Sequence, residues 1–330
     1  MYPRLAYHAR YANVFDFEFC NKCSDTELQE LGCIRHSRDR DWVEEQNFPP
    51  IHNIIFGLSP RSLAVELKKT PNAVHATDAQ GRTALDWAAA RAQLDDMRLL
   101  IAHGSGVNSM DITGRTTILH AVDSHSTEAV RILLEAGADP NPRMPEGLFR
   151  SSPLTAAGFG GFPDMLRLFL QFGANLDAHN PEEKTALHAA ATKRDAECAA
   201  VLLESGATLE DVVGNGWTPI MTAIAHNSHA VLRLFTEWCQ HRLVHVGSTA
   251  CVRSSQLLPV IAEHADSETI RIVTSAVLSL PLSLSFDLGG NTCAAARGVL
   301  RRRGDYDGKL GNAFEELLLR FSVATVEEWH

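Results

Sequence analysis

Cysteine and histidine side chains near the N-terminus have a spacing that could bind a metal ion. They are Cys20, Cys23, Cys33 and His36. Two ligands separated by two residues can both reach one tetrahedral ion, so the set is chemically suited to a structural zinc site of the Cys3His type. Cysteines are also ordinary small buried residues, and a short helix is expected between Cys23 and Cys33. We therefore expect no cofactor, with a structural zinc at these four residues as the alternative.

Histidines elsewhere do not complete a recognisable site. The chain has 15 of them, and His226 with His229, or His241 with His245, could present two imidazoles on one helix face. No carboxylate or cysteine stands at a spacing that would complete a metal site with either pair. The chain also lacks the nucleophile elbow, the phosphate-binding loop and the zinc-protease helix motif. We expect that this protein is not an enzyme.

Composition and charge narrow the class of partner. The net charge is −10, and nucleic acids and anionic membranes both bind basic surfaces, so neither is an expected partner. No apolar run approaches the roughly 20 residues of a membrane helix. Seven scattered cysteines without a secretory signal favour a reducing compartment, the cytoplasm or the nucleus.

A short segment recurs through the middle of the chain at a nearly constant period. It begins with a hydroxyl residue followed by small and apolar residues, and the copies begin at Thr83, Thr116, Ser152, Thr185 and Thr218. These starts are 33, 36, 33 and 33 residues apart, and an earlier copy begins 34 residues before Thr83, at Pro49. Such a period is the signature of a stacked-repeat architecture.

Each copy is followed by a second apolar run that ends in glycine. The runs end at Gly104, Gly137, Gly173 and Gly206, and their apolar residues recur at helical spacing. The leading Thr or Ser is expected to cap the first helix, and the glycine to end the second in a left-handed conformation. Each unit therefore reads as a helix–turn–helix with a connecting loop.

These segments resemble the ankyrin-repeat family. The resemblance is carried by residues 78–83, 111–116, 137–141, 173–177 and 185–188, which match the family's loop, first-helix and closing motifs. It covers about residues 49–238, and it looks similar to the ankyrin proteins encoded in fungal genomes. The resemblance implies an all-α solenoid of about eight stacked helix–turn–helix repeats with degenerate terminal caps.

The chain departs from the family pattern at one histidine of the first helix. His52 and His188 keep it, whereas Asp86, Leu119, Thr155 and Met221 replace it. Because the family histidine bonds loop backbone, we expect looser loop anchoring in those four repeats.

The repeat positions divide the chain into four parts. Residues 1–48 are expected to form an N-terminal cap segment that contains the candidate zinc ligands, and residues 49–238 six repeats. Residues 239–254 are expected to be an irregular insert, and residues 255–330 degenerate repeats and a cap. Atypical terminal repeats are expected because their outer face meets water.

The family binds partners on one concave face, made of loop tips and the exposed end of each first helix. Carried over repeat by repeat, the expected partner-binding residues are Arg82, Arg115, Phe149, Phe159, Lys193, Trp217 and His226. Aromatic and arginine side chains are the usual anchors of protein interfaces, whereas the fold does not need them at these positions. The alternative for Phe149 and Phe159 is that they pack under the longer loop around residues 144–147.

We therefore expect a monomeric interaction scaffold or adaptor that binds a partner protein or peptide on its concave face. The competing hypothesis is an enzyme or small-molecule binder. Its pocket would be roofed by the loop at 144–149, the insert at 239–254 and the N-terminal aromatic residues.

Overall fold

The computed structural model describes residues 48–143, 151–180, 182–212, 216–246, 257–279 and 290–326. They fall into two compact units. Unit 1 ends at Arg150 and unit 2 begins at Ser151. Regular secondary structure in these ranges is helical, with two isolated β-bridges in the loops of unit 1.

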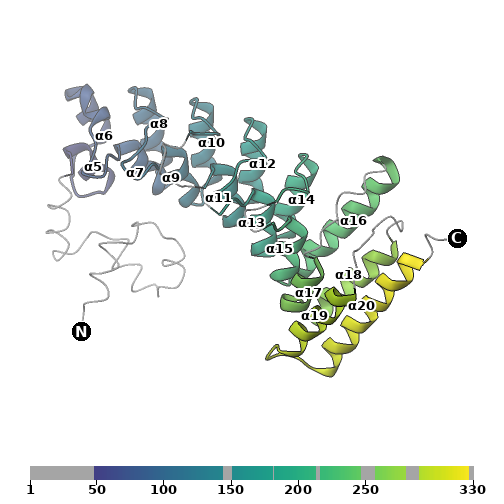
Figure 1. Ribbon diagram of the computed structural model, residues 1–330. Coiled ribbons are helices and arrows are strands. Elements are labelled where there is room, and N and C mark those ends of the chain that lie inside the picture. The colour runs from purple at the N-terminus through teal and green to yellow at the C-terminus, as the bar shows by residue number, and fades with distance from the viewer. Residues whose placement is uncertain are drawn as a thin grey trace, which may run out of the picture. The chain divides into compact units, whose positions relative to one another are not determined.

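Unit 1 is built from helix pairs stacked in chain order. The first helices α5 and α7 pack on each other, as do α7 and α9, and the second helices α8 and α10 form the adjoining row (Figure 1). The helices are α5 (Pro50–Ile55), α6 (Leu63–Lys69), the 3-10 helix η1 (Pro71–His75), α7 (Ala84–Ala90), α8 (Leu94–Ala102), α9 (Thr117–Asp123) and α10 (Thr127–Glu135).

Unit 2 repeats this arrangement. The first helices α11, α13, α15, α17 and α19 each pack on the next, and so do the second helices from α12 to α20. Their bounds are α11 (Pro153–Gly160), α12 (Pro163–Gln171), α13 (Ala186–Lys193), α14 (Ala196–Glu204), α15 (Pro219–Ala225), α16 (His229–Val246), α17 (Leu257–His264), α18 (Ser267–Ser279), α19 (Gly290–Arg301) and α20 (Gly308–Val326). The expected all-α solenoid of stacked helix pairs is confirmed.

Small side chains on the first helices let neighbouring pairs approach closely. Ala89, Ala121 and Ala190 are fully buried in this way. Larger side chains of the second helices, such as Phe169 and Phe235, are equally buried. Burying such a side chain contributes about 1.5–3 kcal/mol, so each pair is stable only when its neighbour covers it.

Helix caps expected from the sequence are present in three repeats, whereas Thr116 makes no side-chain cap bond at the start of α9. Thr83, Ser152 and Thr218 accept the backbone N–H three residues on, at the starts of α7, α11 and α15. The closing glycines all have positive φ, for example +87° at Gly104 and +101° at Gly206. A left-handed residue there lets the chain leave the second helix and enter the next loop.

The expected insert at 239–254 is wrong for its first half. Helix α16 continues without a break to Val246, so residues 239–246 are helical. The reason is that the apolar pattern continues past Phe235, since Cys239, where the insert was expected to begin, is 1% exposed and packs as a core residue. Residues 247–254 lie outside the described part.

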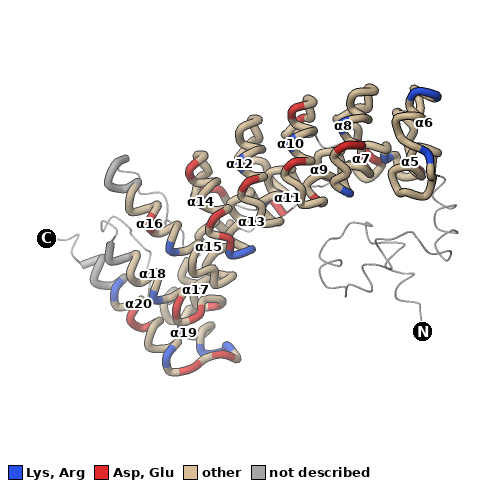
Figure 2. Tube along the Cα trace, turned by 180° about the vertical axis from the view of Figure 1, so that it is seen from behind, with Lys and Arg blue, Asp and Glu red and all other residues tan. Residues whose placement is uncertain are grey.

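The start of most second helices is acidic, and arginines follow one turn later. Asp95, Glu128, Asp164 and Glu197 stand in first turns, where a negative charge complements the helix dipole, and Figure 2 shows acidic residues along this edge. Arginines connect neighbouring pairs there. The links are Arg98 to Glu128 at 3.1 Å, Arg167 to Glu197 at 3.2 Å, and Arg233 to Glu268. These are exposed pairs, so each stabilises the stack by less than about 1 kcal/mol.

The turn between the two helices of a pair needs a left-handed residue that the chain mostly does not supply as glycine. The residues are Ala92, His125, Arg194 and Asn227, with φ between +49° and +62°, whereas Gly161 occupies the same place after α11. A residue with a Cβ is disfavoured by about 1–2 kcal/mol in this region. The folded structure therefore carries small, local strain at these turns.

Replacing Ala92 by glycine should relieve that strain. We expect Ala92→Gly to raise the free energy of unfolding by about 0.5–1 kcal/mol, measured by urea denaturation. Ala88→Gly, inside the buried helix α7, is the matched control and should lower it by about 1 kcal/mol. A loss of stability in Ala92→Gly would contradict the interpretation.

Candidate functional site

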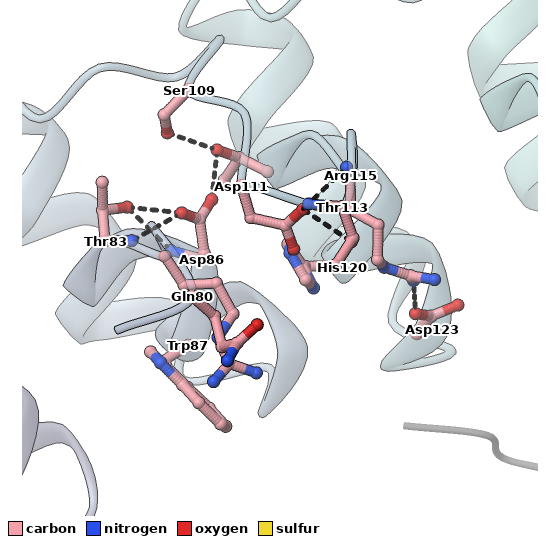
Figure 3. Close-up of polar contacts among 12 residues, drawn as sticks. Gln80, Thr83, Asp86, Trp87, Ser109, Asp111, Thr113, Arg115, His120 and Asp123 are labelled. Atoms are coloured by element: carbon pink, nitrogen blue, oxygen red, sulfur yellow. Dashed lines mark hydrogen bonds and ion pairs between the residues drawn. The ribbon is translucent and has the colours of Figure 1, made fainter. Parts of the chain in front are cut away.

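In three of the described loops that precede a first helix, one polar side chain accepts backbone N–H groups of the loop tip. In unit 1, Asp78 Oδ1 accepts the backbone N–H of Gln80 and Arg82 at 2.8 and 2.9 Å. Asp111 does the same for Thr113 and Arg115 at 2.8 and 3.0 Å (Figure 3). Such bonds hold the loop tip in one conformation before any partner arrives.

The second carboxylate oxygen of each loop aspartate faces a ring on the following helix. Trp87 Nε1 donates to Asp78 Oδ2 at 3.0 Å, and His120 Nε2 lies 3.4 Å from Asp111 Oδ2. Burial alone would raise the pKa of Asp111. The His120 ring, the Thr113 hydroxyl and the Arg115 N–H outweigh burial and hold that pKa well below its usual range.

Where the family histidine is present, it links one repeat to the next. His52 Nε2 lies 3.0 Å from the Arg82 carbonyl oxygen, and His188 Nε2 lies 3.3 Å from that of Trp217. Both imidazoles are fully buried. The histidine therefore ties the loop of the following repeat to the first helix that precedes it.

The expectation of looser anchoring is wrong for Asp86 and Thr155. Asp86 accepts the Thr83 N–H at 2.7 Å. It also accepts the Thr117 hydroxyl of the next repeat at 2.5 Å, a donor that an ionised carboxylate needs as its partner. Thr155 donates its hydroxyl to the Ala178 carbonyl oxygen at 3.0 Å. Aspartate and threonine thus also connect a first helix to the repeat that follows it.

The two arginines predicted to bind a partner are engaged inside unit 1. Arg82 is 8% exposed, pairs with Asp78 at 2.8 Å and stacks 4.2 Å over the Trp87 ring. Arg115 pairs with Asp123, and both side chains are mostly buried. We therefore leave both out of the surface proposed below.

In unit 2 the predicted residues are accessible at the expected positions. Phe159 is half-buried in the last turn of α11, and Lys193 is exposed at the end of α13. His226 caps the end of α15, and Trp217 directly precedes the start of that helix. Phe149 and the candidate zinc ligands Cys20, Cys23, Cys33 and His36 lie outside the described residues, so the zinc site stays a prediction.

Sequence reasoning missed two further residues beside this set. Arg194 is exposed in the turn after α13, and His264 ends α17 with its ring centroid 5.6 Å from that of Trp217. Their common signal was available, since each stands at the end of a first helix, as Lys193 and His226 do. His264 lay in a repeat too divergent to align confidently.

Other types of site are not seen in the part that the structure describes. No three His, Cys, Asp or Glu side chains there are grouped to hold a metal ion. None of the helices described is both long enough and apolar enough to cross a membrane. Cys198 is buried, and desolvation raises the pKa of its thiol, which makes it a poor nucleophile.

The link between Asp86 and Thr117 can be tested by a double-mutant cycle. Asp86→Ala leaves buried donors without an acceptor and should cost about 2–4 kcal/mol in unfolding free energy, and Thr117→Val about 1–3 kcal/mol. The double variant should cost at least about 1 kcal/mol less than the sum of the single variants. Strictly additive costs would show that the two side chains do not interact.

His188 should make stability depend on pH. Burial lowers its pKa from about 6.5 to about 4, so between these pH values the unfolded chain binds a proton at this residue and the folded protein does not. Its stabilisation is therefore complete above about pH 6.5 and is lost as pH falls toward 4.

We expect the wild type to lose about 2 kcal/mol more than His188→Thr between pH 7 and pH 5. Threonine is the matched replacement, because Thr155 makes the equivalent link without a titrating ring. Urea denaturation at the two pH values measures the difference. Parallel losses in both proteins would rule out His188 as the group responsible.

Comparison with known proteins agrees with the geometry. The family model "Ankyrin repeats (3 copies)" matches residues 58–144 and 151–244. The chain is 30% identical over 207 residues to the E3 ubiquitin-protein ligase KEG of Arabidopsis thaliana, covering 59% of this chain and 12% of that protein.

Two human proteins are similar over shorter stretches. Ankyrin repeat and SOCS box protein 16 is 29% identical over 166 residues, covering 48% of this chain and 36% of that protein. Neurogenic locus notch homolog protein 1 is 31% identical over 148 residues, covering 44% and 6%. The chain thus spans well under two thirds of each relative, and the expected resemblance to fungal proteins stays a prediction.

The repeated helix pairs, the buried links from first helices to the repeats that follow them, and a family match over more than half of the chain lead to one conclusion: this chain belongs to the ankyrin-repeat family.

Proposed function

We propose that this protein is a scaffold or adaptor that holds a partner protein or peptide on the concave face of its ankyrin stack. The observation that carries the proposal lies in unit 2. Phe159, Lys193, Trp217 and His226 occupy loop-tip and helix-end positions that the core does not use. Aromatic and basic side chains together are typical anchors of protein interfaces.

The loop before α13 in unit 2 is held in one conformation by its own hydrogen bonds. Asn180 Oδ1 accepts the N–H of Glu182 and of Lys184 at 3.0 and 2.8 Å, as the loop aspartates do in unit 1. Lys184 is further fixed by its ion pair with Glu182 at 2.7 Å. A surface ordered before binding loses little conformational entropy when a partner docks, so its contacts are turned into affinity efficiently.

The competing hypothesis, a roofed pocket, has no specific observation in its favour. Two of its proposed roof segments, residues 144–149 and the N-terminal aromatic residues, lie outside the described part. The first half of the third is the regular helix α16. Asp123, a polar side chain that could line such a pocket, is already paired with Arg115.

Capture experiments with a matched control test the proposal. The tagged chain should capture specific proteins from a lysate of its own organism, identified by mass spectrometry. The double variant Phe159→Ala/Trp217→Ala should capture about tenfold less, because large aromatic anchors commonly contribute more than 1 kcal/mol each.

Phe172→Ala is the control. Phe172 is 40% exposed at the far end of α12, away from the turn that joins α11 to α12, and its loss should leave capture unchanged. Circular dichroism must show that all variants are folded. Equal capture by the double variant and the wild type would contradict the proposed surface.

A further inference from the structure

The ends of the first helices in unit 2 are joined into one row by side-chain hydrogen bonds. Ser228, after α15, donates to the Ala191 carbonyl oxygen of α13 at 2.5 Å. Asn227 donates to the His264 carbonyl oxygen at the end of α17 at 3.1 Å. Arg303, after α19, donates to the Ala265 carbonyl oxygen at 2.7 Å. Four successive helix ends are therefore held side by side.

Basic side chains lie at or just after three of these ends. Arg194 follows α13, His226 follows α15, and His264 ends α17. We call these three residues the basic row. Lys184, from the loop before α13, lies close enough to His226 to affect its charge, as do Arg194 and His264. Groups that can carry a positive charge thus lie together on one face of a chain whose net charge is −10.

Nearby carboxylates are mostly engaged elsewhere. Asp195 accepts the Cys198 N–H at the start of α14, and Asp266 accepts the Thr269 N–H and pairs with His229 at 3.0 Å. Glu197 and Glu268 pair with arginines of the second helices. Among the described residues, Glu263 lies 3.8 Å from the His264 ring with its side chain 65% exposed, and Glu182 pairs with Lys184 at 2.7 Å.

We infer that the basic row, with Trp217 beside it, binds an extended acidic segment of the partner protein. This rests on the proposed function and specifies the chemistry of the partner. Neighbouring helix ends are about 8–10 Å apart, so the three residues span about 16–20 Å, which about six extended residues can follow. Carboxylates spaced along such a segment would meet the three basic groups while an apolar side chain covers the Trp217 ring.

A polypeptide suits this face better than a nucleic acid does. Nucleic-acid binding needs many phosphate contacts, whereas the basic row is one residue wide and the chain carries a net charge of −10. The acidic first turns of α14 and α18 follow Arg194 and His264 directly and would repel a continuous phosphate backbone. A short acidic peptide avoids that edge.

Fluorescence anisotropy with defined peptides tests the inference. The probe is a labelled peptide of about ten residues, rich in glutamate with one central leucine, and the control replaces every glutamate by glutamine. At low salt we expect the glutamate peptide to bind the full chain at least about tenfold more tightly than the glutamine peptide. Arg194→Glu should weaken its binding at least about fivefold.

Arg320→Glu is the matched control. It changes the charge by the same amount on an exposed residue of α20, twelve residues and so about 18 Å along the helix from its start. It should change affinity less than twofold. Equal effects of the two reversals, equal affinity for both peptides, or tighter binding of a single-stranded DNA oligonucleotide would each overturn the inference.

A second readout uses protons. Burial lowers the pKa of His226, and Lys184, Arg194 and His264 lower it further, so the ring is neutral in the free protein at pH 7.5. His229, on the adjoining helix α16, is paired with Asp266. A bound carboxylate would favour the protonated ring, so affinity for the glutamate peptide should rise between pH 7.5 and 6, and less so in His226→Gln.

Failure of this inference and failure of the proposed function can be told apart. If capture from the lysate depends on Phe159 and Trp217 while the glutamate peptide does not bind, only the acidic chemistry of the partner is wrong. If neither the lysate nor the peptide depends on this face, both proposals are wrong.

Discussion

The stack depends on one kind of contact: a buried polar side chain of a first helix that bonds to the repeat after it. His52 and His188 reach a carbonyl oxygen, Thr155 donates to another, and Asp86 accepts a hydroxyl. Apolar burial brings neighbouring pairs together but does not choose their register. A buried donor or acceptor costs about 1–3 kcal/mol when it is unpaired, so these links favour the register in which each finds its partner.

The Asp86 link shows that the interaction is retained while the residue type changes. A carboxylate in place of imidazole would repel a carbonyl oxygen, and Thr117 supplies the donor that makes aspartate acceptable. Burial raises the pKa of Asp86. Nearby His120 and the hydrogen bonds from Thr117 and Thr83 oppose that rise without cancelling it. The sequence of one repeat alone predicts that Asp86 loses the histidine's contact with the following repeat. Only the sequence of both repeats, with Asp86 in one and Thr117 in the next, indicates that another hydrogen bond replaces it.

Periodicity made the fold predictable, because a 33-residue spacing with capping threonines and closing glycines leaves few other architectures. Lys193, Trp217 and His226 lie at the ends or just before the starts of first helices, as the pattern indicated, and their role in binding stays a prediction. Periodicity did not predict that Arg82 and Arg115 are engaged by Asp78 and Asp123, since residue spacing does not say whether a loop cation already has a partner. The extent of α16 was not predicted, because the repeat pattern fades at residue 239 although the helix continues to Val246.

Rigid loops and linked helix ends favour selective binding over tight binding to many partners. Because the helix ends of α13, α15 and α17 are held together by Ser228 and Asn227, their basic residues cannot move apart to fit an arbitrary ligand. Specificity then follows from charge spacing: a segment whose carboxylates match the helix-to-helix distance gains all three contacts, and one with another spacing gains only one or two. His226 sharpens this choice, because its pKa is lowered in the free protein and a nearby carboxylate favours the protonated ring.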